Sequence, residues 1–352
     1  MYTDPASNKN HSSIRLTTMR FNINRLRWLV LCSVFSFLIV LPCLSVYQSF
    51  VAANAYDLLT PSEKYLYDVM EFITVFLSNP ESDLDMLKGT TWSASIFGFK
   101  VSDPLAVVAQ SAAGLELHWP FIATAIIPVL LTIFLGRIFC GWICPATFLY
   151  ELNSNVAAWL AKKGWVQGQR HFDRRIKYWL LAFMLLLSML IGSVLLAAVY
   201  PPAIVGREIY YAITQNGFGI GAIFFMITLL FDVLVARRGF CRYLCPGGAL
   251  YSLLGRYRLL RVKRDVENCN DCHKCTSICE FELDPMRDDF GQECTNCSAC
   301  IVVCPTDALS FSFSSSDTLV QGPGHIGHKY RLIERINMSK QASNKSVDQA
   351  NE

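Results

Sequence analysis

Cysteine spacing places the strongest constraint on how this chain folds. Of its fourteen cysteines, twelve fall into four short groups. Two groups near the C-terminus follow the pattern C-x2-C-x2-C-x3-C; their members are Cys269, Cys272, Cys275 and Cys279, and Cys294, Cys297, Cys300 and Cys304. This is the ligand spacing of proteins that carry two [4Fe–4S] clusters. The C-terminal part must therefore bring eight thiolates around two clusters.

The two C-terminal groups are expected to share their ligands. Three cysteines of a group hold one cluster, and the fourth ligates the other cluster. We therefore assign the first cluster to Cys269, Cys272, Cys275 and Cys304, and the second cluster to Cys294, Cys297, Cys300 and Cys279. Zinc is the alternative, but two C-x2-C pairs already satisfy one zinc ion, so two complete groups are in excess of its needs.

Two details of these groups need a separate interpretation. Cys269-Asn-Asp-Cys272-His273 matches the attachment pattern of c-type haem. It lies inside a cluster group, so we interpret His273 as an exposed loop residue. Proline follows the last cysteine of the second group, whereas Glu280 follows Cys279. The missing proline leaves the predicted ligand set intact.

The other two cysteine groups follow long apolar segments. They are Cys140-Gly-Trp-Ile-Cys144-Pro145 and Cys241-Arg-Tyr-Leu-Cys245-Pro246, and both read C-x3-C-P. On a helix, positions i and i+4 share one face, so each motif presents its two thiols together. Three interpretations stay open: a further Fe–S cluster or other metal site, a redox-active dithiol pair, or a structural motif that fixes the helix ends.

The two C-x3-C-P motifs belong to an internal repeat. Residues 136–150 match residues 237–251 in register, with Arg, Phe, both Cys, Pro, Leu and Tyr in common. The repeat predicts a core built from two copies of an apolar span followed by a cysteine motif.

Four segments are long and apolar enough to cross a membrane, which takes about 20 mostly apolar residues. They are Trp28–Tyr47, Trp119–Phe139, Tyr178–Tyr200 and Phe218–Val235. The composition agrees with a membrane protein, since 53% of the residues are hydrophobic and 17% are charged. Ala53-Asn54-Ala55 resembles a signal-peptidase site, but the preceding tail is long, so we predict an uncleaved first span.

Lysine and arginine predict the orientation, because they concentrate on the cytoplasmic side of a membrane. They are frequent before the first span, between the second and third spans and after the fourth, and sparse in the other two loops. Both termini and the cluster region are therefore expected in the cytoplasm of a bacterium, with the chain crossing the inner membrane several times. The predicted order begins with a cytoplasmic tail (1–27), a first span (28–47) and a periplasmic segment (48–118). A core follows (119–260), with three spans and both C-x3-C-P motifs at the cytoplasmic face. The chain ends with a ferredoxin domain (261–313) and a disordered tail (314–352).

Local patterns complete the predicted fold class. Val262–Val266 and Leu309–Phe313 read as strands at the two ends of the cluster region. Thr60-Pro61-Ser62-Glu63 begins a helix, Asp103-Pro104 opens a turn or short helix, and a short loop is expected near 201–217. The chain is thus predicted to be an α-helical membrane protein with four transmembrane helices and a C-terminal α+β two-cluster bacterial ferredoxin-like domain.

Missing features narrow the function. No histidine lies within a span, which argues against haem b held by two histidines, and no dinucleotide or phosphate loop is present. Electrons are therefore expected to enter or leave through a membrane quinone or through protein partners. Asp232 is the one acidic residue of the fourth span. An intramembrane carboxylate is a functional candidate, so Asp232 either accepts a proton from quinol or pairs with Arg237 or Arg137.

These features together resemble the NapH/MauN family of membrane ferredoxin-type proteins. The resemblance covers residues 103–313 and includes Phe231-Asp232 before the second C-x3-C-P motif and Gly247-Gly248-Ala249-Leu250-Tyr251 after it. NosR and CcoG share the C-x3-C-P element more distantly. The resemblance implies quinol oxidation and delivery of electrons towards a periplasmic reductase or dehydrogenase system, through a companion ferredoxin or a multihaem cytochrome.

Two other functions stay open at this stage. The protein could supply electrons that reduce a metal or a thiol during maturation of another enzyme, or it could be a redox-sensing regulator without turnover of its own. In each case two [4Fe–4S] clusters are expected, with a third Fe–S or metal site if the C-x3-C-P motifs bind one.

Overall fold

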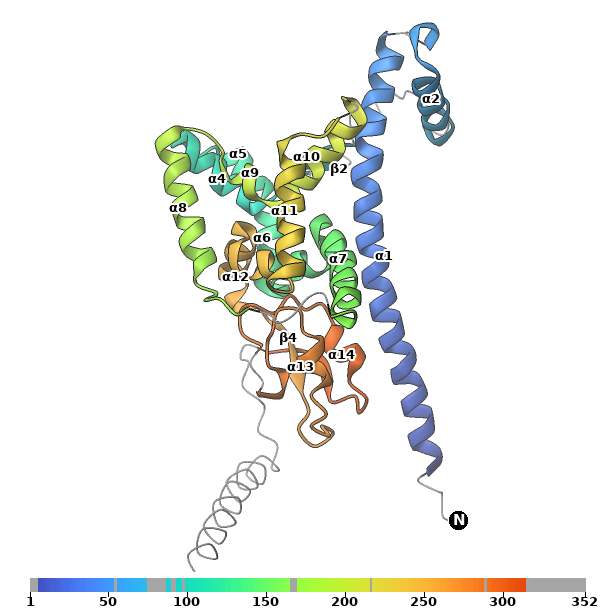
Figure 1. Ribbon diagram of the computed structural model, residues 1–352, viewed down its shortest axis with the longest axis vertical. Coiled ribbons are helices and arrows are strands. Elements are labelled where there is room, and N and C mark those ends of the chain that lie inside the picture. The colour runs from blue at the N-terminus through green and yellow to red at the C-terminus, as the bar shows by residue number, and fades with distance from the viewer. Residues whose placement is uncertain are drawn as a thin grey trace, which may run out of the picture.

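The computed structural model describes residues 6–53, 56–74, 87–89, 93–96, 99–164, 170–215, 217–287 and 290–314. The predicted disordered tail lies outside these residues, apart from Ser314. A bundle of helices is flanked by the long helix α1, and the cysteine-rich C-terminal part lies at one end of the bundle (Figure 1). The beginning of α1 lies at that same end, and α2 lies at the other.

Helix α1 (Ala6–Ala53) contains the first predicted span. The helix already begins at Ala6, within the predicted N-terminal tail, because the sequence from there to Ala53 has no glycine and only one proline, Pro42. Within the described residues, Ile23–Ala53 is the one helical stretch both long and apolar enough to cross a membrane. Helix α2 (Pro61–Thr74) follows the short 3-10 turn η1 (Tyr56–Leu58). It begins where predicted, with Glu63 accepting hydrogen bonds from the Thr60 backbone and hydroxyl.

The second and fourth predicted spans correspond to shorter apolar helices. The second is divided into α5 (Trp119–Thr124) and α6 (Ile126–Leu135), which meet at Ala125. Pro128 explains the division. Its ring clashes with the carbonyl of Thr124, four positions earlier, and so prevents a continuous regular helix. The fourth span corresponds to α11 (Ile220–Leu234).

The third predicted span and the loop after it differ from the structure. Helix α8 (Ile176–Ile191) ends at Gly192, whose φ of +69° stops the helix. The chain continues through α9 (Leu196–Val199) into α10 (Pro201–Thr214), where a short loop was predicted. Two prolines at the start of α10 favour a helix beginning there, a signal that the apolar composition obscured.

The internal repeat extends beyond the predicted residues. One copy comprises α4 (Pro104–Gly114), α5–α6, the π-helical turn η3 (Phe139–Ile143) and α7 (Pro145–Lys162). The other comprises α10, α11, the turn η4 (Phe240–Leu244) and α12 (Pro246–Leu254). The first residues of α4 and α10 meet, since the Tyr200 hydroxyl donates to the Asp103 carboxylate at 2.7 Å. Asp103 also caps α4 by accepting from the Leu105 N–H.

The C-terminal part is a small α+β unit. Strands β4 (Leu260–Arg264) and β5 (Leu309–Phe313) pair antiparallel, with Val262 opposite Phe311. Between them lie the short helices α13 (Lys274–Ile278) and α14 (Ala299–Val303), each next to a cysteine group. The 3-10 turns η5 (Gly255–Tyr257) and η6 (Pro285–Arg287) complete this region. A separate antiparallel sheet, ordered β1-β2-β3, joins Leu87–Gly89, Ser93–Ile96 and Phe99–Ser102 before α4.

Candidate redox site

Each C-x3-C-P motif forms one turn of π-helix rather than α-helix. The Cys144 N–H donates to the Phe139 carbonyl at 2.8 Å, and the Cys245 N–H donates to the Phe240 carbonyl at the same distance. The proline after each motif then begins a new helix, α7 or α12. Such π turns occur often at functional sites.

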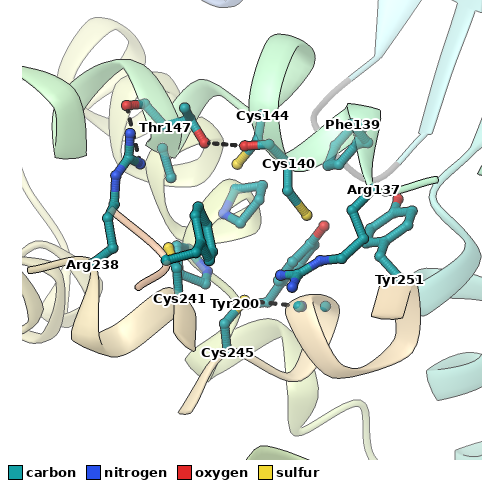
Figure 2. A pocket seen from close by; sticks show the side chains of 16 residues that line it. Arg137, Phe139, Cys140, Cys144, Thr147, Tyr200, Arg238, Cys241, Cys245 and Tyr251 are labelled. Atoms are coloured by element: carbon teal, nitrogen blue, oxygen red, sulfur yellow. Dashed lines mark hydrogen bonds between the residues drawn. The ribbon is translucent and has the colours of Figure 1, made fainter. Parts of the chain in front are cut away.

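The two turns bring all four motif cysteines around one enclosed cavity (Figure 2). Its wall also includes Phe139, Tyr200 and Tyr251, and the Phe139 and Tyr251 rings stack with centroids 5.0 Å apart. Cys144 and Cys245 are buried, and Cys140 and Cys241 are half-buried. The two motifs lie far apart in the sequence, and the fold brings their four cysteines together at one cavity.

Two buried arginines supply positive charge at this site. Arg137 and Arg238 stand three residues before the first cysteine of their respective motifs, and their side chains are 1% and 3% exposed. Both line the cavity (Figure 2). Burial raises the pKa of Cys140, and the neighbouring Arg137 guanidinium opposes that rise. These arginines place two cationic side chains beside the four thiols.

Burial dominates the behaviour of the two deeper thiols. It raises the pKa of Cys144 and of Cys245 to about 12. A redox-active dithiol depends on a lowered pKa, because the thiolate is the reactive form. A metal, in contrast, deprotonates the thiols that coordinate it. The four-thiol site is therefore better suited to a cluster of several iron atoms than to disulfide chemistry.

The two arginines also bind the C-terminal domain. Arg137 pairs with Glu293 at 2.6 Å, and Arg238 pairs with Glu280 at 2.6 Å. Glu293 directly precedes Cys294, and Glu280 directly follows Cys279. Lys177 makes a further ion pair with Glu293. Burial alone would raise the pKa of Glu293, but Arg137 and Lys177 outweigh it and hold that pKa at about 2.

Two further contacts join the first motif to the second cluster group. Trp142 Nε1 donates to the Asn296 carbonyl at 2.9 Å. A Cβ added to Gly141 would lie 2.6 Å from the Thr295 carbonyl oxygen, so only glycine permits this approach. Thr295 and Asn296 form the loop between Cys294 and Cys297. The loop of the second cluster group therefore lies directly against the first C-x3-C-P motif.

The structure places the eight ferredoxin cysteines in the C-terminal domain. Cys269, Cys272, Cys275 and Cys304 line one small cavity. Burial raises the pKa of the Cys300 thiol, and the charges of Cys297, Cys294, Cys279 and Cys275 add to that rise. In the described part of the chain, no three Cys, His, Asp or Glu side chains are close enough together to hold a single metal ion. The cluster assignments themselves stay predictions.

Asp232 occupies a structural position in the motif that follows it. Its carboxylate accepts a hydrogen bond from the Phe240 N–H at 2.9 Å, and its side chain is buried. It does not line the cavity of the four motif cysteines. Its role as an acceptor of quinol protons stays a prediction.

Sequence reasoning did not identify the paired charges as functional residues. Arg137 and Arg238 occupy equal positions of the repeat, which was a usable signal. Glu280 stands where proline was expected, and its ion pair now gives that departure a reason. Nothing in the local sequence marked Glu293, because its role depends on Arg137, which lies far away in the chain.

Comparisons with known proteins agree with this site. A family described as a 4Fe–4S binding domain matches residues 117–163 and 218–267, which contain the two C-x3-C-P motifs. A second family with the same description matches residues 292–310.

The chain is also similar to curated ferredoxin-type proteins. It is 31% identical to the ferredoxin-type protein NapH of Haemophilus influenzae over 69% of this chain and 86% of that protein. The methylamine utilization ferredoxin-type protein MauN of Paracoccus denitrificans is 31% identical over 59% of this chain and 71% of its own length. NapH of Escherichia coli is 30% identical over 68% of this chain and 84% of its own length. No solved structure matches the chain significantly.

Proposed function

The chain belongs to the NapH and MauN family of ferredoxin-type proteins, and from this premise we propose that it oxidises membrane quinol and passes the electrons to a periplasmic redox enzyme system. As a member of this family it is a 4Fe–4S electron-transfer protein. Quinol releases two electrons and two protons on becoming quinone. The expected recipients are a companion ferredoxin or a multihaem cytochrome subunit.

The observation that carries this proposal is the contact between the first C-x3-C-P motif and the loop of the second cluster group. The Gly141 backbone lies against the Thr295 carbonyl, and the Trp142 indole donates a hydrogen bond to the Asn296 carbonyl. Electron transfer depends on such close approach of redox sites. The contact supports a continuous route between the membrane part and the C-terminal domain.

We infer that the four motif cysteines hold a third cluster. Four cysteine ligands are the donor set of a [4Fe–4S] cluster, which when bound accepts and releases single electrons. Cys140, Cys144, Cys241 and Cys245 surround one cavity, and both motifs fall within segments matched as 4Fe–4S binding domains. Arg137 and Arg238 place positive charge beside the thiolates, and each also pairs with a carboxylate of the C-terminal domain.

The first cluster group lies farthest along this route. Cys272 is exposed, whereas Cys294 of the second group is buried against the membrane part. A soluble partner would therefore approach the group formed by Cys269, Cys272, Cys275 and Cys304.

We further propose the four-span topology with both ends of the chain in the cytoplasm. Helices α8 and α11 are shorter than a full span, but each presents apolar side chains to the outside, among them Trp179, Phe183, Ile220 and Ile223, which are 59–86% exposed. Large apolar surfaces of this kind indicate a membrane environment. The start of α1 and the C-terminal domain lie at the same end of the bundle, as a shared cytoplasmic side requires (Figure 1).

The decisive experiment is cluster reduction in anaerobically prepared membranes. Quinol is expected to reduce the clusters, as followed by EPR, without any soluble donor. Reduction only by a cytoplasmic electron donor would reject quinol oxidation and favour a role in maturation or redox sensing.

A further inference from the structure

A further cavity, of about 320 Å³, lies between α1, α7 and the C-terminal domain. Its wall includes Cys140 of the first C-x3-C-P motif and Cys297 of the second cluster group. Small-molecule sites typically occupy about 300–1,000 Å³. The cavity is thus large enough for a ligand, and that ligand would touch two redox sites at once.

The wall combines flat apolar surfaces with a few polar groups. Trp28 and Phe281 contribute aromatic rings, and Ser154 and Asn155 contribute a hydroxyl and an amide. Such a mixture suits a neutral ring that carries oxygen substituents.

The charged groups of this cavity already have partners. Buried Arg27 pairs with Glu151 and donates to the Gly141 carbonyl at 2.8 Å. Arg238 lies between Glu151 and Glu280, at 3.2 Å and 2.6 Å. An anionic ligand such as a phosphate would have to compete with these carboxylates for the arginines. The pairing therefore favours an uncharged ligand.

The mouth of the cavity lies beside apolar surface. Ala158 and Asn155 of its wall are exposed. The helices that carry the wall present Leu29 at 64% and Trp159 at 54% exposure. Because Trp28 of the wall lies near the start of the membrane-spanning stretch of α1, the mouth would lie at the cytoplasmic edge of the lipid, where a hydrophobic tail could leave the cavity.

From these observations we propose that this cavity binds the head group of the membrane quinol. The inference rests on the proposed function, and it assigns a place to a substrate that the sequence could not locate. The ring lies between Trp28 and Phe281, its two oxygens face the polar groups of α7, and its tail extends past Leu29.

Two tryptophan substitutions on α7 test the site. Ala158→Trp fills the cavity from its mouth, and Val156→Trp is the matched control on the same helix, exposed but outside the wall. Titration of the purified, cluster-containing protein with decylubiquinone and with menadione is expected to show at least tenfold weaker binding in Ala158→Trp and unchanged binding in Val156→Trp. Iron content and EPR spectra are expected to stay equal in both.

Photolabelling supplies an independent readout. An azido-benzoquinone is expected to label peptides from residues 24–30 and 150–160, and decylubiquinone should suppress the label. Labelling around Asp232 instead, unchanged binding in Ala158→Trp, or suppression by phosphatidylglycerol rather than by quinone would overturn the proposal. If quinol still reduces the clusters under those outcomes, the proposed function stands and only the site is wrong. If quinone binds here but quinol never reduces the clusters, the site stands and quinol oxidation fails.

Discussion

Arg238 joins the second C-x3-C-P motif to the C-terminal domain through Glu280, whose carboxylate lies 2.6 Å from the arginine Nε. Glu280 stands where a proline was expected after Cys279. Its carboxylate forms an ion pair with Arg238, which a proline could not do. The equivalent arginine of the repeat, Arg137, binds Glu293 of the same domain. Two repeat-related ion pairs therefore join the C-terminal domain to the helical bundle.

Removing one member of such a pair leaves a buried charge without compensation. Glu280→Ala is expected to lower the free energy of unfolding by about 3 kcal/mol, the lower end of the usual range for a buried pair, because Glu151 remains beside Arg238. Denaturant unfolding in detergent measures the change. Glu267→Ala is the control, since Glu267 is an exposed acid of the same domain. Equal stability of the two variants would contradict a binding role for Glu280.

The four-thiol site predicts a specific iron count. After anaerobic purification, the parent protein should contain about twelve iron atoms per chain, since three clusters carry four each. The double variant Cys140→Ser/Cys241→Ser should contain about eight. Iron and sulfide quantification with EPR provides the measurement. About eight in both proteins would leave the C-x3-C-P cysteines without a cluster.

The close approach at Gly141 predicts a sensitive position. Gly141→Ala places a methyl group 2.6 Å from the Thr295 carbonyl, so the cluster loop must move away from the motif. Overpacking of this kind costs about 1–3 kcal/mol. We expect slower quinol-dependent reduction of the second cluster, measured by rapid-freeze EPR. Gly114→Ala is the matched control, because a Cβ there meets nothing within 4 Å. Equal rates in the two variants would show that this contact does not serve electron transfer.

Much of the fold could be predicted from short stretches of sequence. Features that depend on contacts between residues far apart in the chain could not. The cysteine groups, the repeat and strand β5 could be predicted because each depends on residues close together in the chain. The pair of Arg137 and Glu293 spans 156 positions and has no local signature. Helix α10 was also missed, because apolar composition does not reveal that Gly192 ends one helix and Pro201 begins another. The cavity proposed for quinol was beyond prediction for the same reason, since four separate segments form its wall.

The predicted exchange of ligands between clusters can be tested by two single variants. Cys279→Ser should alter the EPR signal of the cluster nearest the membrane part and block quinol-dependent reduction of both ferredoxin clusters. Cys304→Ser should alter the other signal and leave reduction of the nearer cluster intact, because Cys304 lines the more distant cavity. The reverse pattern would show that each group keeps its own fourth cysteine.

Asp103 gives the protein a predictable dependence on pH. Burial raises the pKa of this carboxyl to about 6, although the Tyr200 hydroxyl opposes the rise. In the unfolded chain the pKa is about 3.9, so between these values the folded state binds more protons. The free energy of unfolding must therefore fall as pH rises through this window, by about 1.3 kcal/mol between pH 5 and pH 7.

Asp103→Asn keeps a capping oxygen for α4 and should remove this part of the slope. Tyr200→Phe should move the slope to higher pH, because the carboxylate loses a hydrogen bond that favours its charged form. Denaturant unfolding at a series of pH values tests both variants. An unchanged slope in Asp103→Asn would mean that another group titrates, and the contact between α4 and α10 would then not be the source of the pH dependence.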